Sequence, residues 1–111
     1  MKRVLIVGSE GVVGTQLVKE CIAKFGPNSL ILPIRQKNSW DVSNSKSVSE
    51  LIKRNQPNLI VNLAASYNEN FAEAVSVNVV GSQNILESVY KLGLKARVIL
   101  IGSAAEYGDV T

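Results

Sequence analysis

The sequence predicts an α/β fold with a doubly wound parallel sheet, and two observations support this fold class. Short, continuously apolar runs rich in β-branched residues alternate with segments in which apolar residues recur at helical spacing. Strands that are joined through helices pair in parallel, with right-handed crossovers. The expected strands cover residues 4–7, 29–34, 59–63 and 97–101.

The first strand is expected to end at Gly8, where a tight turn leads into a helix over residues 11–25. Gly26 and Pro27 supply the stop signal for this helix, and Pro33, which lacks an amide donor, should lie near the end of the second strand. The apolar residues at helical spacing in the first helix are Val13, Leu17, Val18, Cys21, Ile22 and Phe25.

Two further helices are expected. The first follows a polar loop at residues 38–43, begins at the capping sequence Ser43-Asn44-Ser45 and carries Val48, Leu51 and Ile52 on one face. The second is long, from about residue 71 to residue 92, with Gly93 as its C-cap. Its apolar members are Val75, Val79, Ile85, Leu86 and Val89.

Length and composition exclude several classes of protein. A chain of 111 residues with 46% hydrophobic residues is one domain with ample material for a core. Its net charge of +3 is dispersed, so no nucleic-acid partner is expected, and one cysteine without any histidine argues against a disulfide, zinc or haem. The apolar run at residues 4–7 is too short for a leader or a membrane span, which predicts a soluble, cytoplasmic protein.

A glycine-rich turn lies where the first strand meets the first helix. Its three glycines, Gly8, Gly11 and Gly14, are those needed for a tight turn, for close approach of a pyrophosphate and for close packing of helix on sheet. The helix N-terminus would then direct free N–H groups at the phosphates. The alternative is a glycine-rich turn without a ligand, but its position inside a strand–turn–helix unit favours dinucleotide binding.

Five motifs in order carry a resemblance to a known family. They are Gly8-Ser9-Glu10-Gly11-Val12-Val13-Gly14, Asp41-Val42, Asn62-Leu63-Ala64-Ala65, the segment Asn78 to Glu87 (NVVGSQNILE), and Gly102 to Gly108 (GSAAEYG). Together they resemble the extended branch of the short-chain dehydrogenase/reductase superfamily, the NAD-dependent epimerase/dehydratase family, and most closely its nucleotide-sugar 4-ketoreductases. The resemblance covers essentially the whole chain. It implies a Rossmann-type sheet of about five strands in the order 3-2-1-4-5.

The resemblance also implies which residues bind the cofactor. The carboxylate of Asp41 and the backbone beside Val42 would meet the adenine, and small residues after the strand at 59–63 would line the cofactor, with Asn62 where the family commonly has histidine. Asp41 could instead be an ordinary capping carboxylate, and Asn78 a structural amide. The expected cofactor-binding residues are Gly8, Glu10, Gly11, Val12, Val13, Gly14, Arg35, Asp41, Val42, Leu63, Ala64, Ala65 and Asn78.

Catalysis in this superfamily uses a Tyr-x-x-x-Lys pair on one helix face, and this sequence has none. The expectation is therefore the amino-terminal part of a longer enzyme, inactive alone. Ser103 matches the family's catalytic serine or threonine, whose hydroxyl would hydrogen-bond the substrate oxygen. The alternative role for Ser103 is that of a turn serine after a strand.

The residues after Ser103 indicate the class of substrate, and those after the second strand indicate which nicotinamide cofactor is bound. Ala104 and Ala105 stand where the related sugar dehydratases carry an acid, which favours a 4-ketoreductase or 4-epimerase acting on a nucleotide sugar. Arg35 and Lys37, without a nearby acid, favour NADP over NAD. Arg35 could also be a solvated surface residue.

A second class of function fits the same features. A non-catalytic module that binds NAD(P) and reports redox state to a partner would also have a short chain without the Tyr-Lys pair. If the chain is the truncated part of a longer enzyme, its sheet stops at the last strand with an unpaired apolar edge, so a homo-oligomer is expected.

Overall fold

A computed structural model describes residues 2–9, 12–33, 40–63 and 79–100. The chain folds into four strands and three α-helices with one short 3-10 helix over this part of the sequence. In chain order the elements are β1 (Val4–Val7), α1 (Val12–Phe25), η1 (Pro27–Ser29), β2 (Leu30–Ile31), α2 (Ser45–Asn55), β3 (Leu59–Asn62), α4 (Gly81–Leu92) and β4 (Arg97–Leu100).

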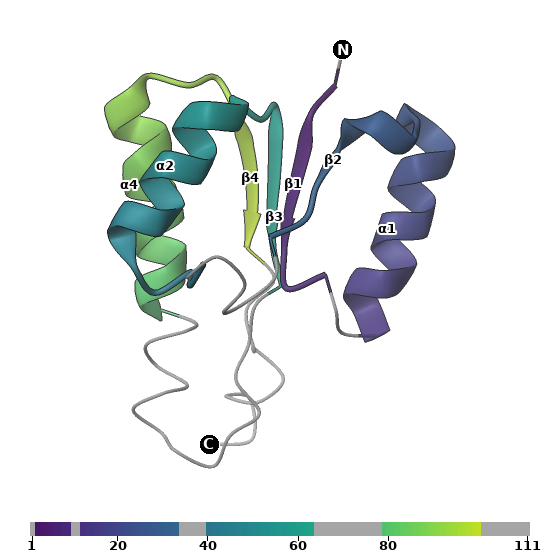
Figure 1. The fold of residues 1–111 in the computed structure, drawn as a ribbon, viewed down its shortest axis with the longest axis horizontal. Coiled ribbons are helices and arrows are strands. Elements are labelled where there is room, and N and C mark those ends of the chain that lie inside the picture. The colour runs from purple at the N-terminus through teal and green to yellow at the C-terminus, as the bar shows by residue number, and fades with distance from the viewer. Residues whose placement is uncertain (1, 10–11, 34–39, 64–78, 101–111) are drawn as a thin grey trace.

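The described strands form one parallel sheet in the order β2-β1-β3-β4. Helix α1 lies on one side of this sheet, and α2 and α4 lie on the other (Figure 1). This is the predicted doubly wound α/β fold. When β3 and β4 are taken as the predicted fourth and fifth strands, the four described strands also follow the predicted order 3-2-1-4-5.

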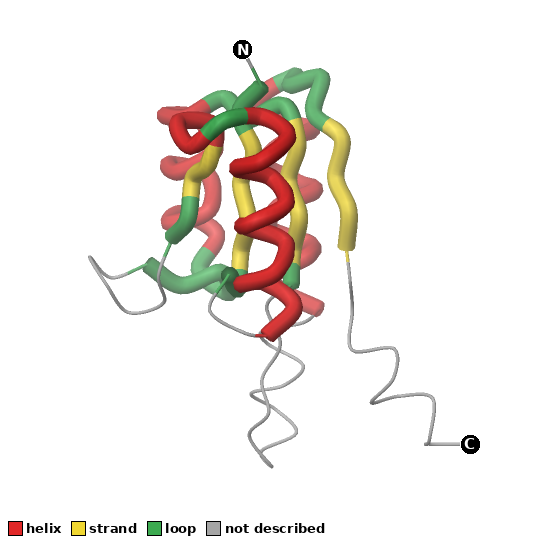
Figure 2. Tube along the Cα trace, turned by 90° about the vertical axis from the view of Figure 1, so that its right-hand side faces the viewer, coloured by secondary structure: helices red, strands yellow, loops and turns green. Residues whose placement is uncertain are grey.

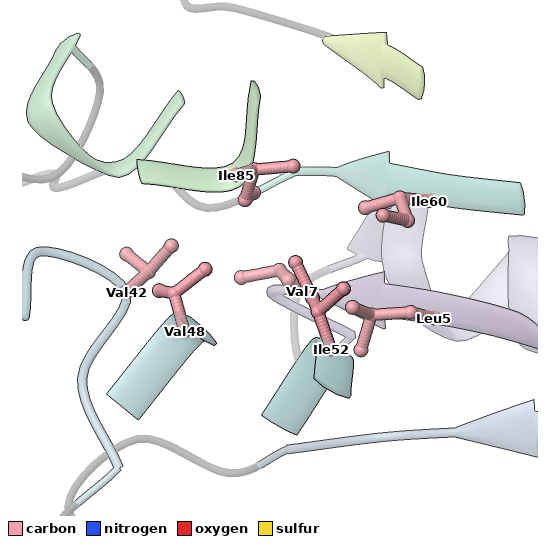
Figure 3. Packing of buried hydrophobic residues seen from close by; sticks show 7 residues of the cluster. All are labelled: Leu5, Val7, Val42, Val48, Ile52, Ile60 and Ile85. Atoms are coloured by element: carbon pink, nitrogen blue, oxygen red, sulfur yellow. The ribbon is translucent and has the colours of Figure 1, made fainter. Parts of the chain in front are cut away.

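Alternating residues of β1 supply the two layers of the core. Leu5 and Val7 face α2 and α4, where they join Ile60, Ile52 and Ile85 in the larger buried cluster (Figure 3). Val4 and Ile6 face α1 and form the smaller cluster with Cys21. All four residues of β1 are buried, which confirms that the run at residues 4–7 is a central strand covered on both faces.

Helix α2 confirms both its predicted cap and its predicted face. Asn44 is the N-cap, and its side chain accepts a hydrogen bond from the backbone N–H of Ser47 at 3.0 Å. Val48 and Ile52 are fully buried, and Leu51 packs against the same cluster. A polar helix with one narrow apolar stripe thus docks on the sheet through that stripe.

Several predicted boundaries differ from those of the structure. The second strand is shorter than the predicted range 29–34, because residues 27–29 form the 3-10 helix η1 and pairing with β1 involves only Leu30 and Ile31. The long helix predicted over 71–92 is described from Gly81 to Leu92, and its first part lies outside the described residues. Gly93 ends that helix in the left-handed conformation, as predicted.

Not all of the apolar residues at helical spacing are buried. Val13 and Ile22 on α1 are 62% and 40% exposed, and Val79 and Leu86 near and on α4 are 55% and 48% exposed. Each helix contacts the sheet along one stripe, and Leu17, Val18 and Phe25 of α1 lie on that stripe with Cys21. Helical spacing of apolar residues therefore predicted a wider buried face for these helices than the structure shows.

The last described strand lies at one edge of the sheet. Within the described ranges β4 pairs with β3 alone, and Ile99 and Leu100 are 41% and 40% exposed. Viewed from the side of α1, β4 has no described helix in front of it (Figure 2). Among the described strands, β4 thus forms an exposed edge with apolar residues, as predicted.

Candidate functional site at the carboxyl edge of the sheet

The candidate site lies where the parallel strands end, which is the edge at which open α/β sheets bind ligands. Strand β1 ends at Val7 and β3 at Asn62, and these two residues are register partners. Helix α1 begins at this same edge, as its position beside the end of β1 shows (Figure 1). The amino terminus of a helix and the ends of two central strands thus converge.

Two of the three turn glycines have observed structural roles. Gly8 has a φ of +83°, a conformation that favours glycine and lets the chain turn sharply after β1. At Gly14 a Cβ atom would lie 2.7 Å from the carbonyl oxygen of Gly8 and from the backbone of Ser9. The first turn of α1 therefore lies directly on the end of β1, as a dinucleotide-binding turn requires.

The first turn of α1 is suited to receive an anion. The helix starts at Val12, so its first backbone N–H groups are at the carboxyl edge of the sheet, and this turn carries no acidic residue. Val13 points away from the core, since 62% of it is exposed. The predicted site residues Glu10 and Gly11 lie outside the described residues.

The Asp41–Val42 pair lies in the short connection that precedes α2. The Oδ1 atom of Asp41 accepts hydrogen bonds from the backbone N–H of Ser43 at 3.0 Å and from its hydroxyl at 2.8 Å. Within the described residues, both side-chain hydrogen bonds of Asp41 are therefore made by Oδ1, and neither is made by Oδ2. Val42 is buried in the larger cluster, whereas its neighbour Asp41 is partly exposed.

The end of β3 supplies the other wall. The backbone N–H of Leu63 donates to the carbonyl of Val7 at 2.8 Å, so the chain continues along β1 beyond the last paired strand residue. The side chain of Asn62 is buried and donates to the hydroxyl of Ser82 at 3.2 Å. Asn62 thus ties the end of β3 to the first turn of α4.

Seven of the predicted site residues cannot be placed. Their positions lie outside the described residues, so their assignments stay predictions from the sequence. They are the catalytic candidate Ser103 and the cofactor candidates Glu10, Gly11, Arg35, Ala64, Ala65 and Asn78.

Three residues of α4 that the sequence interpretation did not assign to the site contact it. Ser82 meets Asn62, Asn84 donates to the carbonyl of Val42 at 3.0 Å, and Gly81 lies against the methyl groups of Val42. All three belong to the motif NVVGSQNILE. Its glycine and its second asparagine were the signals that could have identified them, since neither residue is typical of a helix interior.

The first turn of α1 is compatible with a bound dinucleotide. Glycine at position 14 lets this turn pack against the backbone of Gly8 and Ser9, and the turn itself carries no acidic side chain. Among the described residues, no group of three or more His, Cys, Asp or Glu side chains could hold a metal ion. Over the same ranges, no helix is long and apolar enough to cross a membrane.

Known proteins resemble this chain in sequence and in fold. A GDP-6-deoxy-D-talose 4-dehydrogenase of Aggregatibacter actinomycetemcomitans is 28% identical over 115 residues, which cover 96% of this chain and 37% of that protein. An L-threonine dehydrogenase of Phytophthora infestans superposes with a TM-score of 0.74 and 27% identity, over 87% of this chain and 34% of the other. A GDP-mannoheptose C4 reductase of Campylobacter jejuni, with NADP bound, superposes with a TM-score of 0.66 and 24% identity, over 81% and 27%.

These matches agree on the fold, and each of them aligns this chain with only part of a longer protein. The chain spans about a third of the length of the proteins it matches. The parallel sheet with helices on both sides is the Rossmann-like fold of the dehydrogenases among them. The family model for NAD dependent epimerases and dehydratases matches residues 4–111, and the chain belongs to that family.

Proposed function

We propose that residues 1–111 are the NAD(P)-binding domain, and the amino-terminal part, of an oxidoreductase or epimerase that acts at C4 of a nucleotide sugar. The observation that carries dinucleotide binding is the contact of Gly14 with the backbone at Gly8 and Ser9, which leaves the first turn of α1 at the end of β1. A pyrophosphate bound there would accept hydrogen bonds from the N–H groups of that turn.

The adenine half of the cofactor would lie beside Asp41. Its carboxylate would accept a hydrogen bond from the exocyclic amine of adenine, while the backbone at Val42 meets the ring edge. In support, the side-chain hydrogen bonds of Asp41 within the described part of the chain all use Oδ1. Leu63, Ala64, Ala65 and Asn78 would line the remaining wall, beyond the end of β3.

For the cofactor we propose NADP. Arg35 would pair with the 2′-phosphate, and the following Lys37 would add positive potential. The NADP in the related C4 reductase supports this preference. NADPH should then bind more tightly than NADH, and Arg35→Ala should remove the difference.

The chemistry would occur in the longer protein. Nicotinamide supplies hydride transfer at the sugar carbon, and Ser103 would donate a hydrogen bond to the oxygen on that carbon. Ala104 and Ala105 occupy the positions at which the related dehydratases carry the acid used to eliminate water, and Glu106 is displaced from them, which supports a reductase or epimerase over a dehydratase. The matched GDP-6-deoxy-D-talose 4-dehydrogenase acts on a substrate of this kind.

Threonine is a second candidate substrate. The observation in its favour is the structural match to an L-threonine dehydrogenase at 27% identity. Activity of the full-length protein with L-threonine, and none with GDP-6-deoxy sugars, would decide for this alternative.

The test of dinucleotide binding is a titration of the 111-residue chain with NADPH and NADH, followed by calorimetry. We expect micromolar binding that Gly11→Asp abolishes, because a carboxylate there would block the approach of the pyrophosphate. Asn58→Ala is the matched control, since Asn58 bonds Arg3 at the opposite edge of the sheet. No binding by the unmodified chain would overturn the proposal that these residues suffice for cofactor binding.

We further propose a cytoplasmic homo-oligomer. The support for association is the edge strand β4, where Ile99 and Leu100 are substantially exposed. Light scattering of the chain should give a mass above 12.0 kDa, and a monodisperse monomer would contradict association.

A further inference from the structure

Val42 is held from two directions by α4, an element that follows it in the chain by about forty residues. The Asn84 side-chain amide donates to the Val42 carbonyl oxygen at 3.0 Å, and this contact is buried. On the other side, a Cβ at Gly81 would lie 3.1 Å from both methyl carbons of Val42, so glycine permits the close approach. One hydrogen bond and one close contact from α4 therefore hold Val42, in addition to its packing in the larger cluster.

The neighbouring residue Asp41 depends on this anchor. Asp41 is joined to Ser43 by two hydrogen bonds, and the backbone N–H of Asn44 donates to the Asp41 carbonyl at 3.0 Å. Residues 41–44 are thus a self-bonded turn, and its anchor to α4 is at Val42. A change at Asn84 or Gly81 would move the Asp41 carboxylate together with the turn.

We propose that Asn84, together with Gly81, is a positioning residue that makes the site selective for adenine. This inference rests on the proposed function, because it assumes that the Asp41–Val42 pair meets the adenine of the cofactor. Neither residue needs to contact the cofactor. Asn84 acts through the carbonyl of Val42, whose peptide orientation it holds.

Selectivity for adenine follows from the groups that the turn presents. A carboxylate accepts a hydrogen bond from the amine at position 6 of adenine, whereas hypoxanthine has an oxygen there and a proton on N1. At position 6 adenine has a hydrogen-bond donor and hypoxanthine an acceptor, and at N1 adenine has an acceptor and hypoxanthine a donor. A site whose groups are fixed in place should therefore discriminate against hypoxanthine. A displaced turn loses this discrimination, because its groups no longer meet the base edge at hydrogen-bonding distance.

The experiment compares two cofactors that differ only in their base, the reduced dinucleotides of adenine and of hypoxanthine. Affinities of the 111-residue chain for both are measured by fluorescence for the unmodified protein, for Asn84→Ala and for Gly81→Ala. Asn55→Ala is the matched control, since its side chain donates to the Leu51 carbonyl at 2.9 Å within α2. Thermal melting of each variant sets a working temperature at which all are folded.

We expect the unmodified chain to prefer the adenine dinucleotide. In Asn84→Ala the ratio of the two affinities should fall about tenfold, the size of one lost hydrogen bond. Gly81→Ala should lower the ratio in the same direction by a smaller factor, and it keeps the test decisive if Asn84→Ala does not fold. Asn55→Ala should leave the ratio unchanged.

The outcomes separate this inference from the function on which it rests. If the unmodified chain binds the adenine dinucleotide but both variants keep its base preference, the positioning role is wrong and cofactor binding stands. An equal loss for both dinucleotides also overturns the inference, because it indicates a merely structural role. If the unmodified chain binds neither dinucleotide, both proposals fall.

Discussion

Gly14 of α1 touches the backbone that ends β1 at Gly8. A Cβ at residue 14 would lie 2.7 Å from the Gly8 carbonyl oxygen, a distance that carbon and oxygen atoms do not adopt without bonding. The contact joins the first turn of α1 to the carboxyl end of the central strand. The helix N-terminus therefore has one position relative to the sheet, which is the condition for a pre-formed phosphate site.

Gly14→Ala should destabilise the fold and weaken dinucleotide binding. The added methyl group must displace backbone rather than a flexible side chain, so a loss of about 1–3 kcal/mol in the free energy of unfolding is expected. Urea denaturation measures this loss. Gln16→Ala, at an exposed position of the same helix, is the control, and a Gly14→Ala variant as stable as this control would show that α1 can move off the strand.

Two isoleucines on different helices should respond differently to truncation. Ile52 is fully buried in the larger cluster, so Ile52→Ala should cost about 2–5 kcal/mol. Ile22 is 40% exposed, and Ile22→Ala should change stability by no more than about 1 kcal/mol. Equal losses in urea denaturation would mean that Ile22 is buried in solution, for example in an oligomer.

The cap of α2 should contribute measurably to stability. Asn44→Ala removes the side-chain acceptor of the Ser47 N–H, at an expected cost of about 0.5–2 kcal/mol. Asn44→Asp retains an acceptor and should restore most of the loss. If alanine and aspartate behave alike in thermal denaturation, the cap does not stabilise the helix.

Cys21 should react slowly with alkylating reagents in the folded chain. Burial raises the pKa of its thiol, and the nearby Glu20 raises it further, against a smaller lowering by Lys24. The reactive thiolate is therefore scarce near neutral pH, and iodoacetamide should label Cys21 much faster in urea than in buffer.

The same shift predicts a dependence of stability on pH. Above the ordinary thiol pKa of about 8.5, the unfolded chain releases a proton that the folded chain retains. The contribution of Cys21 to stability is therefore present at neutral pH and is lost as the pH rises above that value. Cys21→Ala should show a smaller decline in stability over this alkaline range, and identical declines would contradict the assignment.

Local patterns in the sequence determined the helices and strands and the glycine-rich turn between β1 and α1. An apolar run such as residues 4–7 can be satisfied only by burial on both faces, and the capping sequence before α2 offers an acceptor to free N–H groups. The glycine spacing indicated where a helix must approach a strand closely. These features depend on residues close together in the chain, so their physical causes are visible in the sequence.

Contacts between distant segments were decided by the tertiary structure. The exposure of Val13 and Ile22 depends on which stripe of α1 meets the sheet, and periodicity does not specify how wide that stripe is. The hydrogen bond from Asn84 to Val42 joins residues 42 positions apart, on a helix and on a loop that meet only because both pack on one face of the sheet. Local propensity carries no information about such a pair, since its geometry exists only after the core has formed.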